Sequence, residues 1–255
     1  LGNHELNVLR GVRKHGADWF FDAAGQPRLR EFAALVEFLR SLPIALERAD
    51  LRIVHASWHA GAIDTLRAEA AEPLSVFERH ERETAARARQ SGLAAAAERE
   101  WRRWSDVLQQ RQVAPPLLES LGQHDELVQM GNPLRIATSG VERLAGQPFF
   151  ASGRWRMVDR VPWWRDYDDE VPVVFGHYWR LWNPPALPDW SYGDLALFDD
   201  VGPQEWLPTR RGAQAFCVDY SVGIRYVERR QRPHGPFAGR LVALRWPERE
   251  LVTDS

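Results

Sequence analysis

Three short segments of the chain place histidine or asparagine where side chains could hold a metal ion. Gly2-Asn3-His4-Glu5 stands at the expected start of a helix, so that Asn3 and His4 could enter one cleft. His55 and His177 each follow a short hydrophobic run that is typical of a buried strand. Neutral imidazole suits Mn, Fe, Ni or Zn, and an amide oxygen completes a mixed nitrogen and oxygen set of ligands. A further imidazole, that of His4, could transfer a proton.

Each segment also has an ordinary structural interpretation. Asn3 could cap a helix while Glu5 occupies its first turn, where carboxylates are favoured. His55 and His177 could each be core histidines with satisfied nitrogens. His59 stands four residues after His55, but its place in a loop argues against a shared metal, so we do not expect it to be a ligand. The three segments together favour the metal site.

The distribution of hydrophobic residues predicts a mixed α/β protein. Helical spacing covers 3–15 and 28–42, and Pro43 ends the second of these helices. The range 60–130, rich in Ala, Arg and Glu, is predicted to be a helical insertion within a single domain of residues 1–255. Strands are expected at 51–55, 134–138, 171–175, 195–198, 215–218 and 241–244. Gly176 is expected to allow close approach of the backbone before His177.

Composition limits the classes of function. A formal net charge of −2 provides no basic field that would attract nucleic acid or an anionic membrane. No apolar run reaches the roughly 18 residues of a membrane span. Cys217 is the single cysteine, so an intrachain disulfide is excluded and nothing indicates an oxidising compartment. We therefore expect a cytoplasmic protein with neither a nucleic-acid nor a membrane partner.

The three segments resemble the last three signature blocks of calcineurin-like metallophosphoesterases. The similarity is greatest to the branch that contains phosphoprotein phosphatases and bacterial diadenosine tetraphosphatases. The matching segments are GNHE at 2–5, VHA at 54–56 and VFGH at 174–177. Further similarity lies at 134–143, 163–164, 216–220 and 239–244, so the resemblance covers most of the chain outside the helical insertion.

The resemblance implies a β-sandwich flanked by helices, with the site at the carboxyl ends of the strands. It implies that Asn3, His55 and His177 ligate one metal of a pair, and that His4 protonates the leaving oxygen. Manganese is the expected metal, with Fe, Ni or Zn as alternatives, and a hydroxide activated by two metals is the implied nucleophile. The earlier family blocks, GD-x-HG and GD-x-x-DRG, do not occur after Leu1, so we expect the remaining ligands upstream and an inactive fragment.

The implied activity is hydrolysis of a phosphate ester or phosphoanhydride. A small phosphorylated molecule or a dinucleoside polyphosphate is favoured over a phosphoprotein, because a helical insertion beside the ligand loops would enclose the pocket. The insertion could instead lie away from the mouth and only stabilise the fold or an oligomer. The alternative function is a catalytically inactive, phosphatase-like binding or interaction module. Arg135, Arg143 and Arg180 lie near the motifs, but the sequence does not select the arginine that would bind phosphate.

Overall fold

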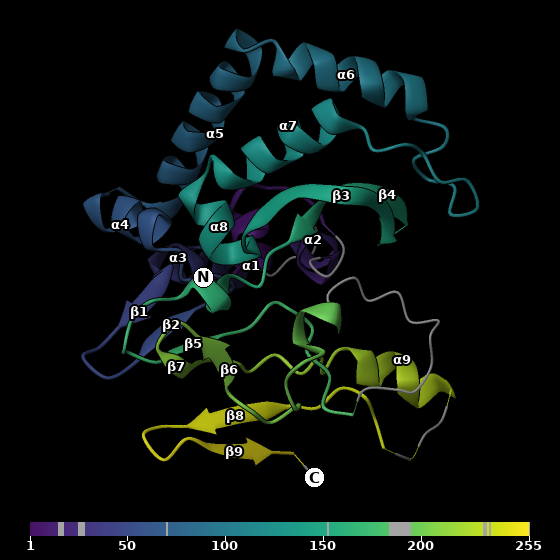
Figure 1. Cartoon of the computed structure of the whole chain (residues 1–255). Helices are drawn as coiled ribbons and strands as arrows, with labels where there is room; N and C mark the ends of the chain where they lie inside the picture. Colours follow the sequence, from purple (N-terminus) through teal and green to yellow (C-terminus); the bar gives the residue numbers. More distant parts are fainter. Residues whose placement is uncertain are drawn as a thin grey trace.

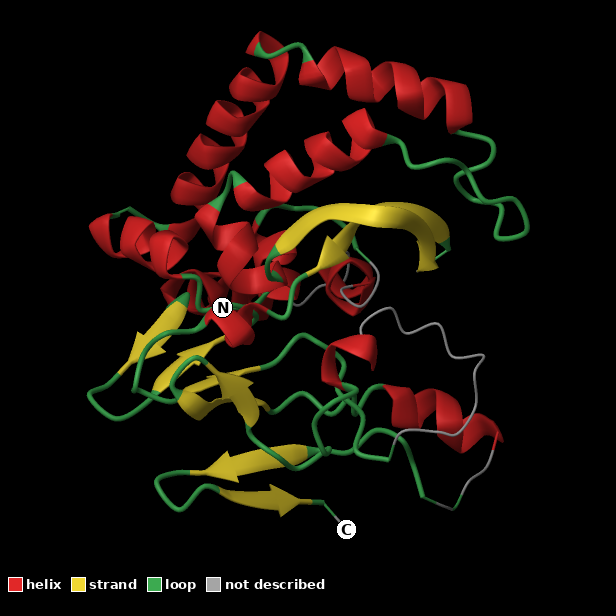
Figure 2. Ribbon diagram, viewed as in Figure 1, coloured by secondary structure: helices red, strands yellow, loops and turns green. Residues whose placement is uncertain are grey.

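The computed structural model describes residues 1–14, 18–24, 29–69, 71–151, 153–183, 195–231, 234 and 236–254. These residues form a mixed α/β protein in which a five-stranded sheet, two separate hairpins and a set of helices pack together (Figures 1 and 2). The helices are α1 (Asn3–Leu9), α2 (Asp18–Ala24), α3 (Leu29–Ser41), α4 (Ala60–Ala68), α5 (Pro73–Gln90), α6 (Leu93–Trp104), α7 (Glu119–Met130), α8 (Pro133–Ser139), α9 (Ile224–Gln231) and the 3-10 turns η1 (Trp163–Asp166) and η2 (Leu195–Phe198). The strands are β1 (Ala45–Glu47), β2 (Arg52–Val54), β3 (Glu142–Ala151), β4 (Arg154–Arg160), β5 (Val173–Phe175), β6 (Leu207–Thr209), β7 (Gly212–Cys217), β8 (Val242–Arg245) and β9 (Glu250–Thr253).

The five-stranded sheet has the order β1-β2-β5-β7-β6, and its three central strands run parallel. Arg52 pairs with Val173, and Val173 pairs with Ala215, so equivalent residues of the three central strands are aligned across the sheet. β1 and β6 flank them as antiparallel edge strands. The carboxyl ends of β2, β5 and β7 consequently reach the same edge of the sheet, where sites form in open α/β proteins.

Both faces of the sheet are covered around β5 and β7, which explains the hydrophobic character of these two strands. Val173 and Ala215 belong to the core on one face, together with Trp163 and Trp164 from η1. Their neighbours Val174 and Phe216 belong to the core on the other face, where the β8–β9 hairpin packs. Each of the larger side chains contributes roughly 1.5–3 kcal/mol by leaving water, so this double burial holds the strand register in place.

The first helices form a smaller cluster beside the sheet. α3 confirms the helix predicted at 28–42, and its apolar side chains pack against Val8 and Leu9 of α1. α1 is shorter than predicted because Gly11 takes a left-handed backbone conformation, with a φ of 67°, and its N–H bonds to the carbonyl of Val8. The predicted end of this helix at His15 lies outside the described residues.

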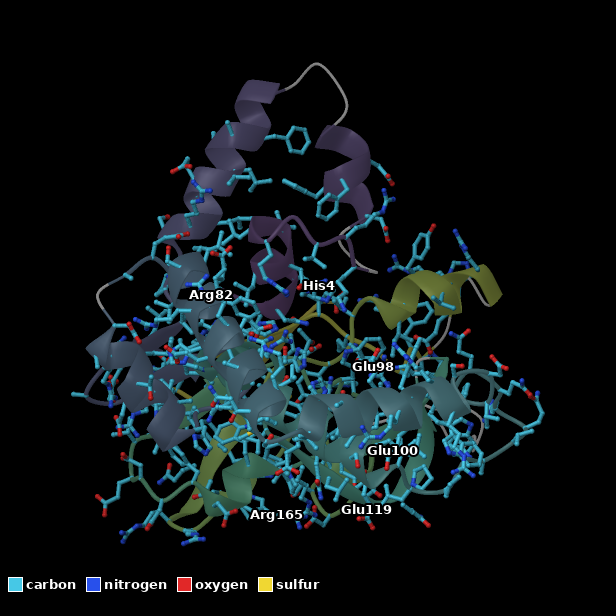
Figure 3. The ribbon with its side chains drawn as sticks, turned by 90° about the horizontal axis from the view of Figure 1, so that it is seen from above. His4, Arg82, Glu98, Glu100, Glu119 and Arg165 are labelled. Carbon is cyan, nitrogen blue, oxygen red and sulfur yellow. The ribbon has the colours of Figure 1, made fainter. Side chains whose placement is uncertain are left out.

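The stretch predicted as a helical insertion divides into two parts. α4 packs on the main core through Ile63 and contacts α8. α5, α6 and α7 instead form an arm that rests on the β3–β4 hairpin, with α6 outermost (Figure 1). α7 approaches the hairpin closely at Gly122, where a Cβ atom would stand 2.3 Å from Cδ1 of Leu144. Figure 3 shows the labelled charged side chains of the arm, Arg82, Glu98, Glu100 and Glu119, apart from His4 on α1.

Two predicted strands are helical turns in the structure. The segment 134–138 belongs to α8, because the side chain of Asn132 accepts a hydrogen bond from the N–H of Leu134 and Pro133 occupies the first helical turn. The segment 195–198 forms η2, whose Phe198 ring stacks on Trp164 with ring centroids 5.2 Å apart. Stacking on the aromatic core, and not pairing with a strand, therefore fixes this segment.

The other strand predictions are confirmed at β2, β5, β7 and β8, although their limits shift by one to three residues. β1, β3, β4, β6 and β9 were not predicted. In the part of the chain that the structure describes, no helix combines the length and apolar character needed to cross a bilayer.

Asn132 gives a test of how α8 is held. Its side chain caps α8 and also donates to the carbonyl of Phe77 and the carboxylate of Glu81, and it is fully buried. Asn132→Ala should lower the free energy of unfolding by about 2–4 kcal/mol, because a cap is lost and buried acceptors lose their donor. Urea denaturation measures the change. Asn183→Ala, which removes one exposed hydrogen bond to Phe237, is the control and should cost less than about 1 kcal/mol; equal losses would contradict the assignment.

Candidate metal centre

The carboxyl ends of the three parallel strands deliver polar residues to one edge of the sheet. His55 directly follows β2, and the N–H of Gly176 donates to its carbonyl oxygen over 2.9 Å, so the β2–β5 pairing continues past the strands. His177 stands two residues after β5, and Asp219 stands two residues after β7. Because Phe175 is in register with Cys217, His177 and Asp219 occupy equivalent places on neighbouring strands.

Asn3 faces this edge from the start of α1. Its Oδ1 lies 3.1 Å from Nε2 of His55. The interpretation of Asn3 as a helix cap is therefore wrong, since Gly2 is the N-cap residue and Asn3 is already helical. Glu5 in the first turn bonds back to the N–H of Gly2 over 3.0 Å. Gly2 packs so tightly that a Cβ atom there would stand 2.6 Å from Oε2 of Glu5 and 2.7 Å from the His55 ring.

His177 lies next to His55, with ring centroids 5.3 Å apart. One side of the His177 ring is hydrogen-bonded to the backbone of Ser139, while Nε2 is buried and has no hydrogen-bond partner. The Ser139 bond therefore falls to Nδ1, which leaves the lone pair of Nε2 available. His177 also has a φ of 71°, a conformation that a non-glycine residue adopts at a cost of about 1–3 kcal/mol. A strained backbone and an unsatisfied nitrogen in one residue are typical of a functional position.

Both histidines are held in the neutral form. Burial lowers the pKa of His55, and the positive chain end and His4 lower it further, against the opposing charges of Glu5 and Asp219. Burial, followed by the positive charge of Arg160, lowers the pKa of His177 well below its ordinary value. Neutral imidazole is the form that can ligate a metal, so the lowered pKa values are compatible with the predicted role of both rings.

An amide oxygen and two imidazoles, those of Asn3, His55 and His177, lie together at this edge of the sheet. Oδ1 of Asn3 and Nε2 of His55 are at hydrogen-bonding distance, 3.1 Å, and the ring of His177 lies beside that of His55. Among the described residues, however, no group of three or more His, Cys, Asp or Glu side chains could hold a metal by itself. The centre therefore depends on the amide oxygen of Asn3. His4 is exposed and close enough for its charge to act on both rings.

Several other residues singled out in the sequence lie outside the centre. His59 caps α4, its Nδ1 accepting the N–H of Ala62 over 3.2 Å. Gly176 is not required for close approach, because a Cβ atom there would meet its neighbours at ordinary distances of 3.5–3.6 Å. Cys217 is wholly buried in β7, and burial raises the pKa of its thiol to about 12.

Three contributors to the centre were not identified from the sequence. Asp219 follows a buried strand just as His55 and His177 do, so the same pattern could have revealed it. Arg160 acts on His177 through its charge, but no short-range pattern links β4 to the loop after β5. The backbone of Ser139 contributes through a contact that depends only on the tertiary fold.

Two cavities are lined by residues other than Asn3, His55, His177 and Asp219. One of about 530 Å³ lies on the sheet face beneath α4 and is lined by Arg52, Trp58, Trp163, Tyr167 and Asp169, among others. A second, of about 270 Å³, lies between α4, β1, α5 and α8.

Comparison of the chain with protein-family models, with curated proteins and with solved structures found no match. The functional interpretation therefore rests on the residues and their geometry.

The lowered pKa values predict how the metal-free protein responds to acid. Unfolded histidine takes up a proton near pH 6.5, whereas His55 and His177 resist protonation in the folded state. The free energy of unfolding should be greatest above about pH 6.5. As the pH drops below that value, it should decrease by up to about 1.4 kcal/mol per pH unit for each histidine. Urea denaturation with a chelator between pH 7.5 and 5 measures the slope. His177→Gln should reduce the slope, and an unchanged slope would refute the proposed protonation behaviour of His177.

Proposed function

We propose that the chain carries part of the active site of a calcineurin-like metallophosphoesterase. The observation that supports this most is the convergence of Asn3, His55 and His177, with the buried, unpartnered Nε2 of His177 among them. The proposed activity is metal-dependent hydrolysis of a phosphate ester or phosphoanhydride. The proposed centre would contain two divalent ions, with Mn the expected metal and Fe, Ni or Zn the alternatives.

The residues of this chain have distinct tasks in the proposal. Asn3, His55 and His177 would hold one metal ion, and the Ser139 contact leaves Nε2 of His177 as the nitrogen that could ligate it. When bound, the metals would supply a hydroxide nucleophile and neutralise charge on the phosphoryl group. His4 is exposed at the start of α1 and donates a proton to the departing oxygen. Asp219 contributes negative charge beside His55, which offsets part of the charge of a bound cation.

A small phosphorylated molecule or a dinucleoside polyphosphate remains the proposed substrate, in preference to a phosphoprotein. The arm of α5, α6 and α7 rests on the β3–β4 hairpin, and β4 ends at Arg160, whose charge reaches His177. The arm is thus connected to the centre through this hairpin. An arm that narrowed access to the centre would favour small ligands over folded proteins.

The alternative is a phosphatase-like module that binds a ligand or a partner without catalysis. Among the described residues, no group of three acidic, histidine or cysteine side chains could hold a metal, so the centre depends on an amide oxygen. This dependence favours the second function. Metal binding without hydrolysis by the longest natural form of the protein would support it.

Metal binding gives the first test of the proposed function. Isothermal titration with Mn²⁺ should show one site, and Asn3→Ala, His55→Ala and His177→Ala should each weaken it by roughly tenfold or more, since each removes a ligand. His59→Asn is the matched control, because it alters a neighbouring histidine while preserving a side chain that can cap α4. Equal affinity in the wild type and all three ligand variants would refute the assignment of the ligands.

The role of His4 has its own test in hydrolysis. Rates with Mn²⁺ are measured for the chain and for the chain extended by its upstream coding sequence. In whichever of these proteins hydrolyses the substrate, His4→Asn should slow hydrolysis of an alkyl phosphate by roughly 10²-fold or more, because a poor leaving group needs a proton. The rate with 4-nitrophenyl phosphate should fall much less. Equal losses on both substrates would exclude His4 as the proton donor.

A further inference from the structure

The cavity of about 530 Å³ beneath α4 has the size of a small-molecule site and is not used by the proposed metal centre. Sites that bind small molecules usually have volumes of roughly 300–1,000 Å³. Three aromatic side chains, those of Trp58, Trp163 and Tyr167, contribute to its walls. Trp163 and Tyr167 meet edge to face, with ring centroids 6.2 Å apart. The cavity therefore presents aromatic surface to a ligand.

The two arginines that line this cavity are already neutralised. Arg52 is paired with Glu47 and Asp169, with nitrogen–oxygen distances of 2.9 and 2.6 Å. Arg67 is paired with Asp64 over 2.7 Å and with the same Glu47. Because each guanidinium group contacts two carboxylates, neither is left free to bind an anionic ligand.

The acidic side chains around the cavity leave an excess of negative charge. Three carboxylates, those of Glu47, Asp64 and Asp169, face only two guanidinium groups, and all are ionised at neutral pH. Two more aspartates line the cavity, and each pairs with an arginine outside the lining: Asp166 with Arg210 and Asp168 with Arg211. The charge of the walls therefore favours a positively charged ligand.

The side chain of Arg52 shows how these walls hold a flat cation. Its guanidinium carbon lies 5.0 Å from the centre of the Trp58 ring, and its Nη1 donates to the Tyr167 hydroxyl over 2.8 Å. The same nitrogen is paired with Asp169. A cation gains from an aromatic face and from a nearby carboxylate together. Trp58, Tyr167 and Asp169 also bound the open space of the cavity, so the ligand meets the same kinds of group.

We propose that this cavity binds a small organic cation, namely a flat or aromatic group that bears an amidine, a guanidine or an amine. The aromatic walls contact the flat group, and Asp64 and Asp169 offset its charge. Asn3, His55 and His177 do not line the cavity. The inference is therefore independent of the proposed metal centre and of the proposed function.

Benzamidine, a flat aromatic cation, is the probe that tests the proposal. Isothermal titration of the whole chain is carried out with a chelator present, so that the metal centre takes no part. Benzamidine should bind with a Kd in roughly the millimolar range, as expected for so small a ligand. Benzamide has nearly the same shape but no charge, and it should bind at least about tenfold more weakly.

Two exposed side chains of α4 should shift the affinity for benzamidine in opposite directions. Asp64→Asn removes a negative charge from the wall and should weaken binding by roughly threefold to tenfold. Arg67→Gln releases Glu47 and Asp64 from their partner and should strengthen binding by a similar factor. Glu98→Gln is the matched control, because it breaks an exposed ion pair within α6, outside the cavity lining, and should match the wild type.

Opposite shifts in the two α4 variants, with no shift in Glu98→Gln, would support the site. The proposal is overturned if benzamidine does not bind the wild-type chain, or if benzamide binds as tightly as benzamidine. It is also overturned if both α4 variants match the wild type, or if Glu98→Gln changes the affinity as much as they do. Circular dichroism checks folding, and if one α4 variant does not fold, the direction of the shift in the other decides.

Discussion

The parallel pairing of β2, β5 and β7 is the constraint on which the candidate centre depends. Because the paired strands are in register, they end together and the residues that follow them lie close to one another. The register is held because side chains alternate between two buried faces, and a slip by one residue would exchange the two sets. His55, His177 and Asp219 are therefore brought together by hydrophobic packing several residues away from them. Asn3 is added from outside the sheet, by the helix that begins at Gly2-Asn3.

The same packing that stabilises the fold sets the chemistry of the edge. Burial keeps the imidazoles neutral, and the Ser139 bond orients the ring of His177. A positive charge beside a buried imidazole and a positive φ at the same residue both cost free energy. These residues therefore destabilise the fold locally. Packing of the aromatic core on one sheet face and of the β8–β9 hairpin on the other compensates for this cost.

The sequence predicted the parts of this arrangement that depend on short-range patterns. The runs ending at His55 and His177 are hydrophobic and β-branched, and both proved to be strands. The run at 134–138 looks similar, but its three apolar residues do not distinguish a strand from a helix, and Asn132 and Pro133 at its start favour a helix. Arg160 could not be placed, because its approach to His177 depends on how the hairpin folds over the sheet. Whether these residues bind metal remains a prediction, since the geometry brings them together but does not identify a ligand.

The burial of Cys217 has a practical consequence. It is the only cysteine of the chain, it has no exposed surface, and its thiol pKa of about 12 keeps it protonated at neutral pH. Since the thiolate is the reactive form, maleimide and disulfide reagents have almost nothing to attack in the native protein. A cysteine introduced on α6 or at the tip of the β3–β4 hairpin would be the one reactive thiol. Fluorophores or spin labels can thus be attached at chosen sites without first removing a native side chain from the core.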